Sequence, residues 1–279
     1  MSYSFFQPLS IYEQGKRDNQ EDSIFPKHQH ATSADRLFIL CDGMGGYEKG
    51  EVASSTICEH LSHYLLQKGT FSDKLFYEAL EYSYEKLCEK AVNGENRMGT
   101  TLTLLFFQEQ GCFAAHIGDS RIYHIRPDKH QILFVSRDHS LVNDLLDAGM
   151  LAKEDVANFP QRHVITRAIR MDKKICRSDV DVNHIKDIQD GDYFLMMSDG
   201  MLENLSEDEL LHLVCRKDMS DEEKRNWLIE NSAGNSDNHS AYIIHINNVH
   251  ELEKKKIDYW KIAFFILCAL FAIFVYCFF

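Results

Sequence analysis

The chain has 279 residues, of which 44% are hydrophobic and 26% charged, a composition typical of a globular protein with a sizeable core. Its formal net charge of −13 excludes nucleic acid as an expected partner, because binding to phosphate backbones requires clustered positive charge. The eight cysteines include no C-x-x-C pair and the N-terminus lacks a signal-peptide pattern, which indicates free thiols in a reducing compartment.

Short apolar runs predict β-strands along the first 250 residues. In chain order they cover 37–41, 100–107, 112–117, 121–125, 132–135, 193–197 and 241–246. The short gaps between residues 100 and 135 favour an antiparallel meander. Helical segments interrupt groups of strands rather than alternating with them, so packed antiparallel sheets with outer helices are expected.

Three helices are predicted from spacing and end signals. Apolar residues repeat on one helical face from Val52 to Leu65 and again from Leu75 to Leu87. Ser206, followed by Glu209, has the pattern of a capping box and predicts a helix that begins there and continues to Val214.

The C-terminal end is strongly apolar. Residues 260–279 read WKIAFFILCALFAIFVYCFF, and no charge occurs after Lys261. A membrane-spanning helix needs roughly 17–25 residues, and the lysines at 254–256 and 261 lie on one side only, as in a cytoplasmic flank. We therefore expect a transmembrane helix at 260–279, a juxtamembrane tether at 248–259, and a single-pass C-terminal anchor with the domain in the cytoplasm. The alternative is a peripheral protein whose tail packs on its own domain.

Acidic residues recur where predicted strands end. They are Asp42-Gly43, Gly118-Asp119 and Asp199-Gly200 after apolar strands, Asp237 before the last strand, and Glu21-Asp22 near the N-terminus. Any one such pair is explained by a turn, because Asp and Gly are turn formers. Several carboxylates at one rim of a sheet would repel one another unless they are protonated or neutralised by cations. Oxygen ligands favour Mg²⁺, Mn²⁺ or Ca²⁺ over Zn²⁺.

Other chemistries lack their motifs. The sequence contains no EF-hand spacing, Walker A loop, G-x-G-x-x-G, H-E-x-x-H or G-x-S-x-G pattern. Its fourteen histidines are interpreted as solvated or packed side chains. A chain with many carboxylates and no evident nucleophile suggests metal-activated water.

An ordered set of short motifs spans about residues 5–247. They are Arg17 with Glu21-Asp22, Asp42-Gly43-Met44-Gly45-Gly46, Gly99-Thr100-Thr101, Gly118-Asp119-Ser120-Arg121, Ser198-Asp199-Gly200 and Asp237-Asn238. In order and rough spacing the set resembles the PPM (PP2C-like) family of serine/threonine phosphatases. Asp138-His139-Ser140 and the stretch 159–168 are similar to the bacterial branch, where they lie around a flap beside the site.

The resemblance implies an α+β fold, an αββα sandwich of two antiparallel sheets flanked by helices, with a phosphatase domain over residues 1–247. It also implies a centre of two Mn²⁺ or Mg²⁺ ions and a third, weaker one. The ligands carried over are Asp42 between both metals, the Gly43 carbonyl, Glu21 or Asp22 on one metal, Asp199 and Asp237 on the other, and Asp119 on the third. Arg17 would grip the substrate phosphate, since a guanidinium suits two phosphate oxygens.

The expected function is hydrolysis of phosphoserine and phosphothreonine in proteins, with kinases or their substrates as partners. The chain departs from the family pattern at Ile169-Arg170, where Ala-Leu-Gly is expected, and Met44 stands where animal members carry a histidine as general acid. Two alternatives stay open: a non-catalytic relative that binds a phosphoprotein or kinase, and a phosphohydrolase for small molecules.

Overall fold

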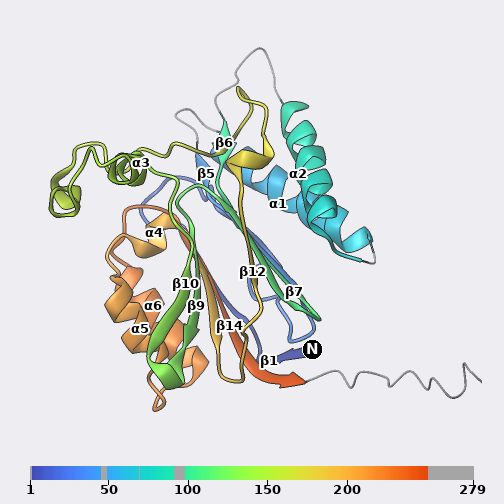
Figure 1. Ribbon diagram of the computed structural model, residues 1–279, viewed down its shortest axis with the longest axis vertical. Helices are drawn as coiled ribbons and strands as arrows, with labels where there is room; N and C mark the ends of the chain where they lie inside the picture. Colours follow the sequence, from blue (N-terminus) through green and yellow to red (C-terminus); the bar gives the residue numbers. More distant parts are fainter. Residues whose placement is uncertain (1, 45–48, 69, 91–97, 251–279) are drawn as a thin grey trace, which may run out of the picture.

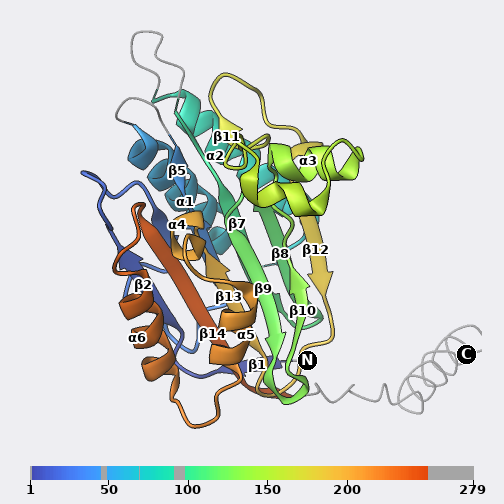
Figure 2. The same ribbon diagram turned by 90° about the vertical axis from the view of Figure 1, so that its left-hand side faces the viewer.

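The fold, seen in a computed structural model, is described for residues 2–44, 49–68, 70–90 and 98–250. Two antiparallel sheets pack face to face (Figures 1 and 2). The six-stranded sheet has the order β1 (Ser2–Phe5), β14 (His239–His250), β13 (Tyr193–Met197), β9 (Arg121–Arg126) and β10 (Gln131–Val135), with β2 (Leu9–Glu13) also paired to β14. The five-stranded sheet has the order β12 (Asp181–Ile185), β8 (Gly111–Ile117), β7 (Leu102–Gln108), β4 (Leu37–Cys41) and β3 (Ser23–Phe25). A small third sheet joins β11 (Ile169–Arg170), β6 (Gly99–Thr100) and β5 (Gly43–Met44).

Helices cover the outer faces of both large sheets (Figure 1). The five-stranded sheet carries α1 (Gly50–Gln67) and α2 (Asp73–Cys88), and the six-stranded sheet carries α4 (Asp199–Leu202), α5 (Glu207–Val214) and α6 (Asp221–Ser232). The remaining helix, α3 (Leu141–Asp147), lies on a segment that projects from one end of the sandwich. Short 3₁₀ turns occur at Pro127–Lys129, Lys153–Asn158 and Arg177–Asp179.

Strand β4 shows why the two sheets lie between two layers of helices, in the order helix, sheet, sheet, helix. Its side chains alternate, so that Leu37, Ile39 and Cys41 pack with α1 and α2, whereas Phe38 and Leu40 pack toward the other sheet. All five are buried. A strand that is apolar at every position must have both faces covered, and the two faces of β4 belong to two different hydrophobic layers. A third layer lies between the six-stranded sheet and α5 and α6.

The sequence predicted the strands β4, β7, β8, β9, β10, β13 and β14 and the helices α1, α2 and α5. It missed β1, β2, β3, β5, β11, β12, α3, α4 and α6. The predicted strand 193–197 has the bounds of β13, and α5 begins at the predicted capping box, where Ser206 Oγ accepts from the Glu209 N–H at 3.3 Å. The predicted meander over 100–135 is wrong in its pairing. Strands β7 and β8 pair in one sheet and β9 and β10 in the other, because the chain crosses between the sheets at residues 118–120.

The predicted fold class is corrected in one part. The antiparallel αββα sandwich is confirmed, but no helix in the described ranges is both long and apolar enough to cross a bilayer. The predicted transmembrane helix at 260–279 lies outside the described residues, and neither it nor the membrane localisation that depended on it is retained. Strand β14 runs through 248–250, where the tether was expected to begin. The domain boundary at 247 stays a prediction.

Candidate metal centre

Strand pairing brings the acidic turns to one end of the sandwich. In the six-stranded sheet, Met197 at the end of β13 is opposite both Arg121, at the start of β9, and Ala241, near the start of β14. Asp199 comes two residues after Met197, and Asp119 comes two residues before Arg121. These carboxylates, which are far apart in the sequence, therefore share one rim, and Asp237 lies just before β14 at the same rim.

The five-stranded sheet contributes its acidic residues at the same end. Ser23 pairs with Cys41, which places Asp22 beside Asp42. The backbone around Asp42 is fixed by Thr101, whose Oγ1 accepts from the Asp42 N–H at 3.0 Å and whose own N–H donates to the Asp42 carbonyl at 2.8 Å. Asp22 is 2% exposed, and its Oδ2 accepts from the Ser198 hydroxyl at 3.2 Å.

The pKa values of these carboxyls are raised, because the groups lie close to one another and are shielded from water. Burial, followed by the charges of Asp22 and Asp199, raises the pKa of Asp42 well above its ordinary value. Burial, with the charge of Asp199, raises the pKa of Asp22 to about 7, and the same two causes raise the pKa of Asp119 to about 7. Burial also raises the pKa of Asp199, although its hydrogen bond with Asp42 opposes that shift. Positive charge is what this group of side chains lacks.

Two carboxylate oxygens at this rim are buried and have no hydrogen-bond partner among the described residues. They are Oδ1 of Asp22 and Oδ1 of Asp119. A buried carboxylate oxygen that accepts no hydrogen bond is costly, and a hard divalent cation is the ligand that removes this cost. The donor set is made of carboxylate oxygens, which is the chemistry that Mg²⁺ and Mn²⁺ prefer. The residues therefore fit a divalent cation.

Arg17 lies at the edge of this rim and points at one of the predicted ligands. Its guanidinium donates to Oδ2 of Asp237 at 2.6 Å, and 54% of its side chain is exposed. The hydrogen bond to Asp237 is the main reason that the pKa of Arg17 is raised. Arg17, which is predicted to bind phosphate, is thus in contact with Asp237, which is predicted to bind metal.

Close backbone packing explains the glycines beside the carboxylates. A Cβ on Gly43 would lie 2.3 Å from the carbonyl oxygen of Gly50 and 2.5 Å from that of Glu21, so only glycine fits. This packing sets the N-terminus of α1 against Glu21. Burial, then the charge of Glu51, raises the pKa of Glu21. Glu51 also has a buried Oε2 without a partner in the described residues.

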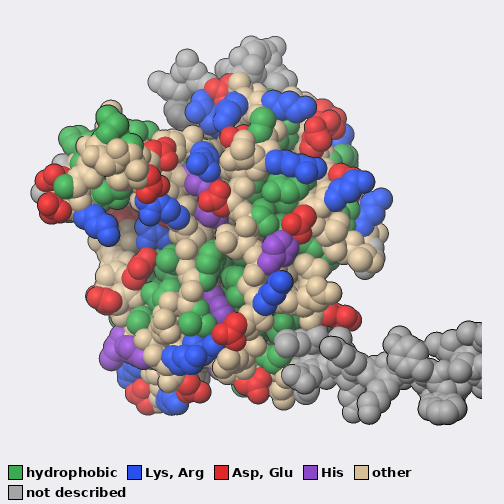
Figure 3. Space-filling view, viewed as in Figure 1, with side chains coloured by type: hydrophobic (Ala, Val, Ile, Leu, Met, Phe, Trp, Pro, Cys, Tyr) green, Lys and Arg blue, Asp and Glu red, His purple; other side chains and the backbone are tan. Residues whose placement is uncertain are grey.

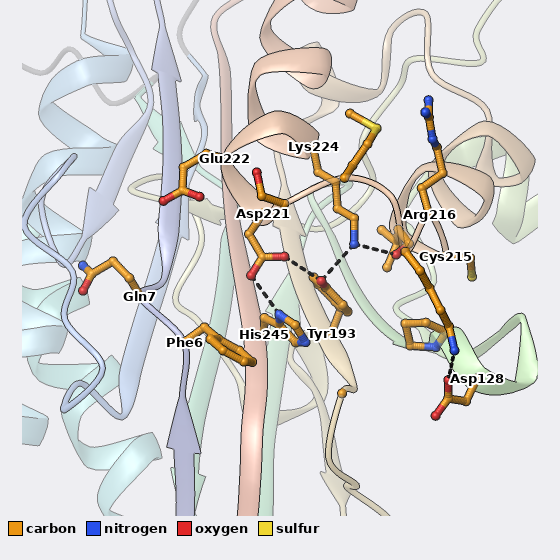
Figure 4. Close-up of a pocket in the computed structure, with 16 residues that line it drawn as sticks. Phe6, Gln7, Asp128, Tyr193, Cys215, Arg216, Asp221, Glu222, Lys224 and His245 are labelled. Atoms are coloured by element: carbon orange, nitrogen blue, oxygen red, sulfur yellow. Dashed lines mark hydrogen bonds and ion pairs between the residues drawn. The ribbon is translucent and has the colours of Figure 1, made fainter.

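A further hollow lies away from the acidic rim. A cavity of about 560 Å³ opens beside Tyr193, at the opposite end of β13 from Asp199 (Figure 4). Its buried polar groups already satisfy one another: Lys224 Nζ donates to the Tyr193 hydroxyl at 2.9 Å, and Asp221 accepts from Tyr193 at 2.6 Å and from His245 at 2.8 Å. This network attaches α6 to β13 and β14, and we assign it a structural role.

The segment that carries α3 projects beside the acidic rim. Hydrophobic side chains gather on part of it in Figure 3, with acidic and basic side chains beside them. Met150 is 75% exposed there. The segment leaves the domain after Ser140 and returns at Ile165, where the two residues form an isolated antiparallel bridge.

Comparison with known proteins identifies the family. The family model described as protein phosphatase 2C matches residues 14–230. The chain belongs to the protein phosphatase 2C family. It is similar to protein phosphatase PhpP of Streptococcus pneumoniae, with 33% identity over 83% of this chain and 94% of that protein. It is also similar to the serine/threonine phosphatase stp of Listeria monocytogenes, with 30% identity over 75% of this chain and 83% of that protein.

Solved structures of the family share the fold. The serine/threonine phosphatase PstP/Ppp of Mycobacterium tuberculosis superposes with a TM-score of 0.72 at 27% identity, over 88% of this chain and all of that one. A structure of the PstP catalytic domain with two manganese ions has a TM-score of 0.69 at 26% identity, again over 88% of this chain and all of that one. The resemblance inferred from the motifs is confirmed, and Mn²⁺ or Mg²⁺ is the cofactor of this family's phosphatases.

Sequence reasoning assigned no role to the neutral residues that hold the centre together. Asn238, which belongs to the Asp237-Asn238 motif, is the main example: its Oδ1 accepts from the Glu21 N–H at 2.8 Å, and its amide donates to the carbonyls of Gln14 and Asn19 at 2.7 and 2.9 Å. Glu51 was also missed. The usable signals were the Asn that directly follows Asp237 and the Glu that opens a helix just after a glycine cluster.

Proposed function

We propose that this protein is a metal-dependent phosphatase that hydrolyses phosphoserine and phosphothreonine in proteins, including serine/threonine kinases or their substrates. The observation that carries the proposal is the acidic rim, where the buried Asp22 lies beside the partly buried Asp42 and Asp119 and beside Asp199. Two buried oxygens there have no partner among the described residues. Family membership and the manganese-bound relative support it.

We propose the ligand set that the resemblance implies, and the arrangement of the rim supports it. Asp42 is central, because the charges of Asp22, Asp199 and Asp119 all act on its pKa. Together with the carbonyl of Gly43 and the carboxylates of Glu21 and Asp237, these groups would hold Mn²⁺ or Mg²⁺, with Asp119 serving a third ion. When bound, the ions supply a water nucleophile of lowered pKa and positive charge near the phosphoryl oxygens.

The chain's own groups would orient the substrate. Arg17 is largely exposed and reaches the rim, so its guanidinium can bind two oxygens of the phosphate monoester. The contact of Arg17 with Asp237 has a simple reason: the guanidinium neutralises a carboxylate that a bound cation would also neutralise. Substrate binding by Arg17 therefore requires that Asp237 finds another positive partner.

The test uses the full-length protein with a phosphothreonine peptide. Activity should require added Mn²⁺ or Mg²⁺, and Asp42→Asn should lower kcat by orders of magnitude because it removes a negative ligand. Full activity in EDTA would defeat the proposal. A kcat/KM for small phosphate esters that equals or exceeds the value for the peptide would instead indicate a small-molecule phosphohydrolase. Every carboxylate that the family pattern requires is present, so nothing favours the non-catalytic alternative.

A further inference from the structure

The turn between β8 and β9 carries Asp119 from one sheet to the other. Gly118 has a φ of +107°, and a Cβ at this position would lie 2.6 Å from Cγ2 of Thr101, so only glycine fits. Asp119 follows directly, and its buried Oδ1 has no hydrogen-bond partner in the part of the chain that the structure describes. The position of the Asp119 carboxylate therefore depends on whatever holds the backbone of Gly118.

One residue holds both polar groups of Gly118. The His139 N–H donates to the Gly118 carbonyl at 2.9 Å, and the Gly118 N–H donates to Nδ1 of His139 at 3.1 Å. His139 is only 5% exposed, and its ring stacks on that of His116 with centroids 4.7 Å apart. A buried backbone N–H needs an acceptor, and here a side chain from the segment after β10 supplies it.

This hydrogen bond fixes the tautomer of His139. Because Nδ1 accepts from Gly118, the proton of the neutral ring must be on Nε2. Nε2 lies 3.3 Å from Oδ2 of Asp181, an acceptor, which agrees with that tautomer. Arg167 also approaches Nε2, at 3.4 Å, but both atoms are then donors, and the guanidinium is better paired with Oδ1 of Asp181 at 3.5 Å. Burial and the neighbouring His116 lower the pKa of His139, as expected for a neutral ring.

The backbone of His139 is bonded to the base of the projecting segment, defined here as residues 141–163. The His139 carbonyl accepts from the Thr166 N–H at 2.9 Å, where the chain returns from that segment. The next residue, Ser140, is bridged to Ile165, and Leu141 N–H donates to the Val164 carbonyl at 2.8 Å. His139 thus lies where the two ends of the projecting segment meet, and it touches the Asp119 turn from there.

A metal site is the competing explanation. His116, His139 and Asp181 place ligand atoms within 4.8 Å of one another. Two observations oppose it. Nδ1 of His139 accepts from Gly118, so Nε2, which faces Asp181, carries the proton of the neutral ring and has no lone pair for a metal. The guanidinium of Arg167 already supplies positive charge at Asp181.

We propose that His139 is a positioning residue, which holds Asp119 in place through Gly118 and ties that turn to the base of the projecting segment. The proposal rests on the proposed function only in its kinetic part. Its structural part, the link from the His139 ring to the Gly118 amide, holds whether or not the protein is a phosphatase.

The experiment uses two substitutions, and each of them places an amide group near one of the two ring nitrogens of His139. In His139→Asn the side-chain oxygen stands near the position of Nδ1 and still accepts from Gly118, whereas in His139→Gln the amide stands near Nε2 and reaches only Asp181. Amide hydrogen exchange of the metal-free full-length protein is followed in peptides that cover residues 113–122. We expect exchange there to be about 10-fold faster in His139→Gln than in His139→Asn, because only the former leaves the Gly118 N–H without an acceptor. Equal exchange in the two variants would overturn the proposal.

The kinetic part is measured with the Mn²⁺ dependence of phosphopeptide hydrolysis. His139→Gln should lower kcat by about 10-fold to 100-fold with little change in KM, as substitution of residues that orient ligands does, and His139→Asn should recover most of it. His116→Ala is the matched control: it removes the stacked, buried ring without touching Gly118, so its kcat should exceed that of His139→Gln at equal stability. A Zn²⁺ site that His116→Ala abolishes would overturn the proposal, because Nε2 of His139 would then be a ligand. If no variant or wild type hydrolyses the peptide, the proposed function fails and the exchange result still decides the link.

Discussion

Asp22→Asn should stabilise the metal-free protein while it removes a metal ligand. Asp22 is 2% exposed, and burial raises its pKa from 3.8 to about 7. An acid whose pKa is higher in the folded state holds its proton more tightly there, so the free energy of unfolding falls as pH rises from 3.8 to about 7 and stays lower above that. At about 1.4 kcal/mol per pKa unit, the largest such loss is about 4 kcal/mol.

Asparagine cannot ionise, and it keeps an oxygen that can accept from Ser198. In EDTA, the unfolding free energy of Asp22→Asn should therefore match that of wild type near pH 4 and exceed it by up to about 4 kcal/mol at pH 8. Urea denaturation at both pH values measures this. At saturating Mn²⁺ the order should reverse, since binding stabilises only the protein that has the complete ligand set.

Asp192→Asn is the control with the opposite sign. Asp192 is fully buried, and burial alone would raise its pKa, but hydrogen bonds from Arg126 and His124 outweigh burial and lower the pKa. This substitution should destabilise the protein at pH 8 by about 3–5 kcal/mol, because it breaks a buried ion pair. If Asp22→Asn is no more stable than wild type at pH 8 in EDTA, the view of the rim as an uncompensated anionic cluster is wrong.

Two further predictions concern the edge of the site and a helix end. Arg17→Ala should raise KM for a phosphopeptide by about 10-fold and leave kcat within about 3-fold, because a charged hydrogen bond to the phosphate is present in the ground state; steady-state kinetics test this, and a fall in kcat at unchanged KM would contradict it. Ser206→Ala should lower the unfolding free energy by about 1 kcal/mol through loss of the α5 cap, whereas Ser206→Thr should retain most of it; equal stability of both variants in urea would show that the cap contributes nothing.

The sequence predicted the elements that have strong local signals. Strand β13 is apolar at every position, and the Ser206–Glu209 cap is a local pattern, so both could be identified without the structure. Strand β12 (Asp181–Ile185) was missed, because its DVNHI sequence has little apolar character and its place is set by pairing with β8. Such an edge strand is determined by its partner rather than by its own composition.

The metal centre was predictable to the same extent. Asp42, Asp119, Asp199 and Asp237 could be named because they lie close to apolar strands. Glu21-Asp22 was named as an acidic pair near the N-terminus, and the family motifs gave the order. The motifs also include Asn238 and Ser198, but the contacts of these two residues could not be predicted, because they join distant parts of the chain: Asn238 holds Glu21 from 217 positions away, and Ser198 reaches Asp22 across 176 positions. The division of the predicted meander between two sheets could not be predicted for the same reason. It depends on the turn at Gly118, whose positive φ and close packing against Thr101 are set by the three-dimensional structure.

The two ends of β13 show why an Asp-Gly pair alone identifies no site. Asp190-Gly191-Asp192 precedes the strand and Ser198-Asp199-Gly200 follows it, with similar composition. At the first end, Asp192 accepts from Arg126 at 2.8 Å and from His124 at 2.8 Å, so its charge is neutralised within the fold and its pKa is lowered. At the second end, Asp199 faces other carboxylates and its pKa is raised. Desolvation acts to raise the pKa of both aspartates, so desolvation does not separate a structural charge from a functional one. What separates them is whether the protein supplies the counter-charge itself. Where it does, the charge is internal to the fold; where it does not, the counter-charge must be bound from solution, and a cation site results.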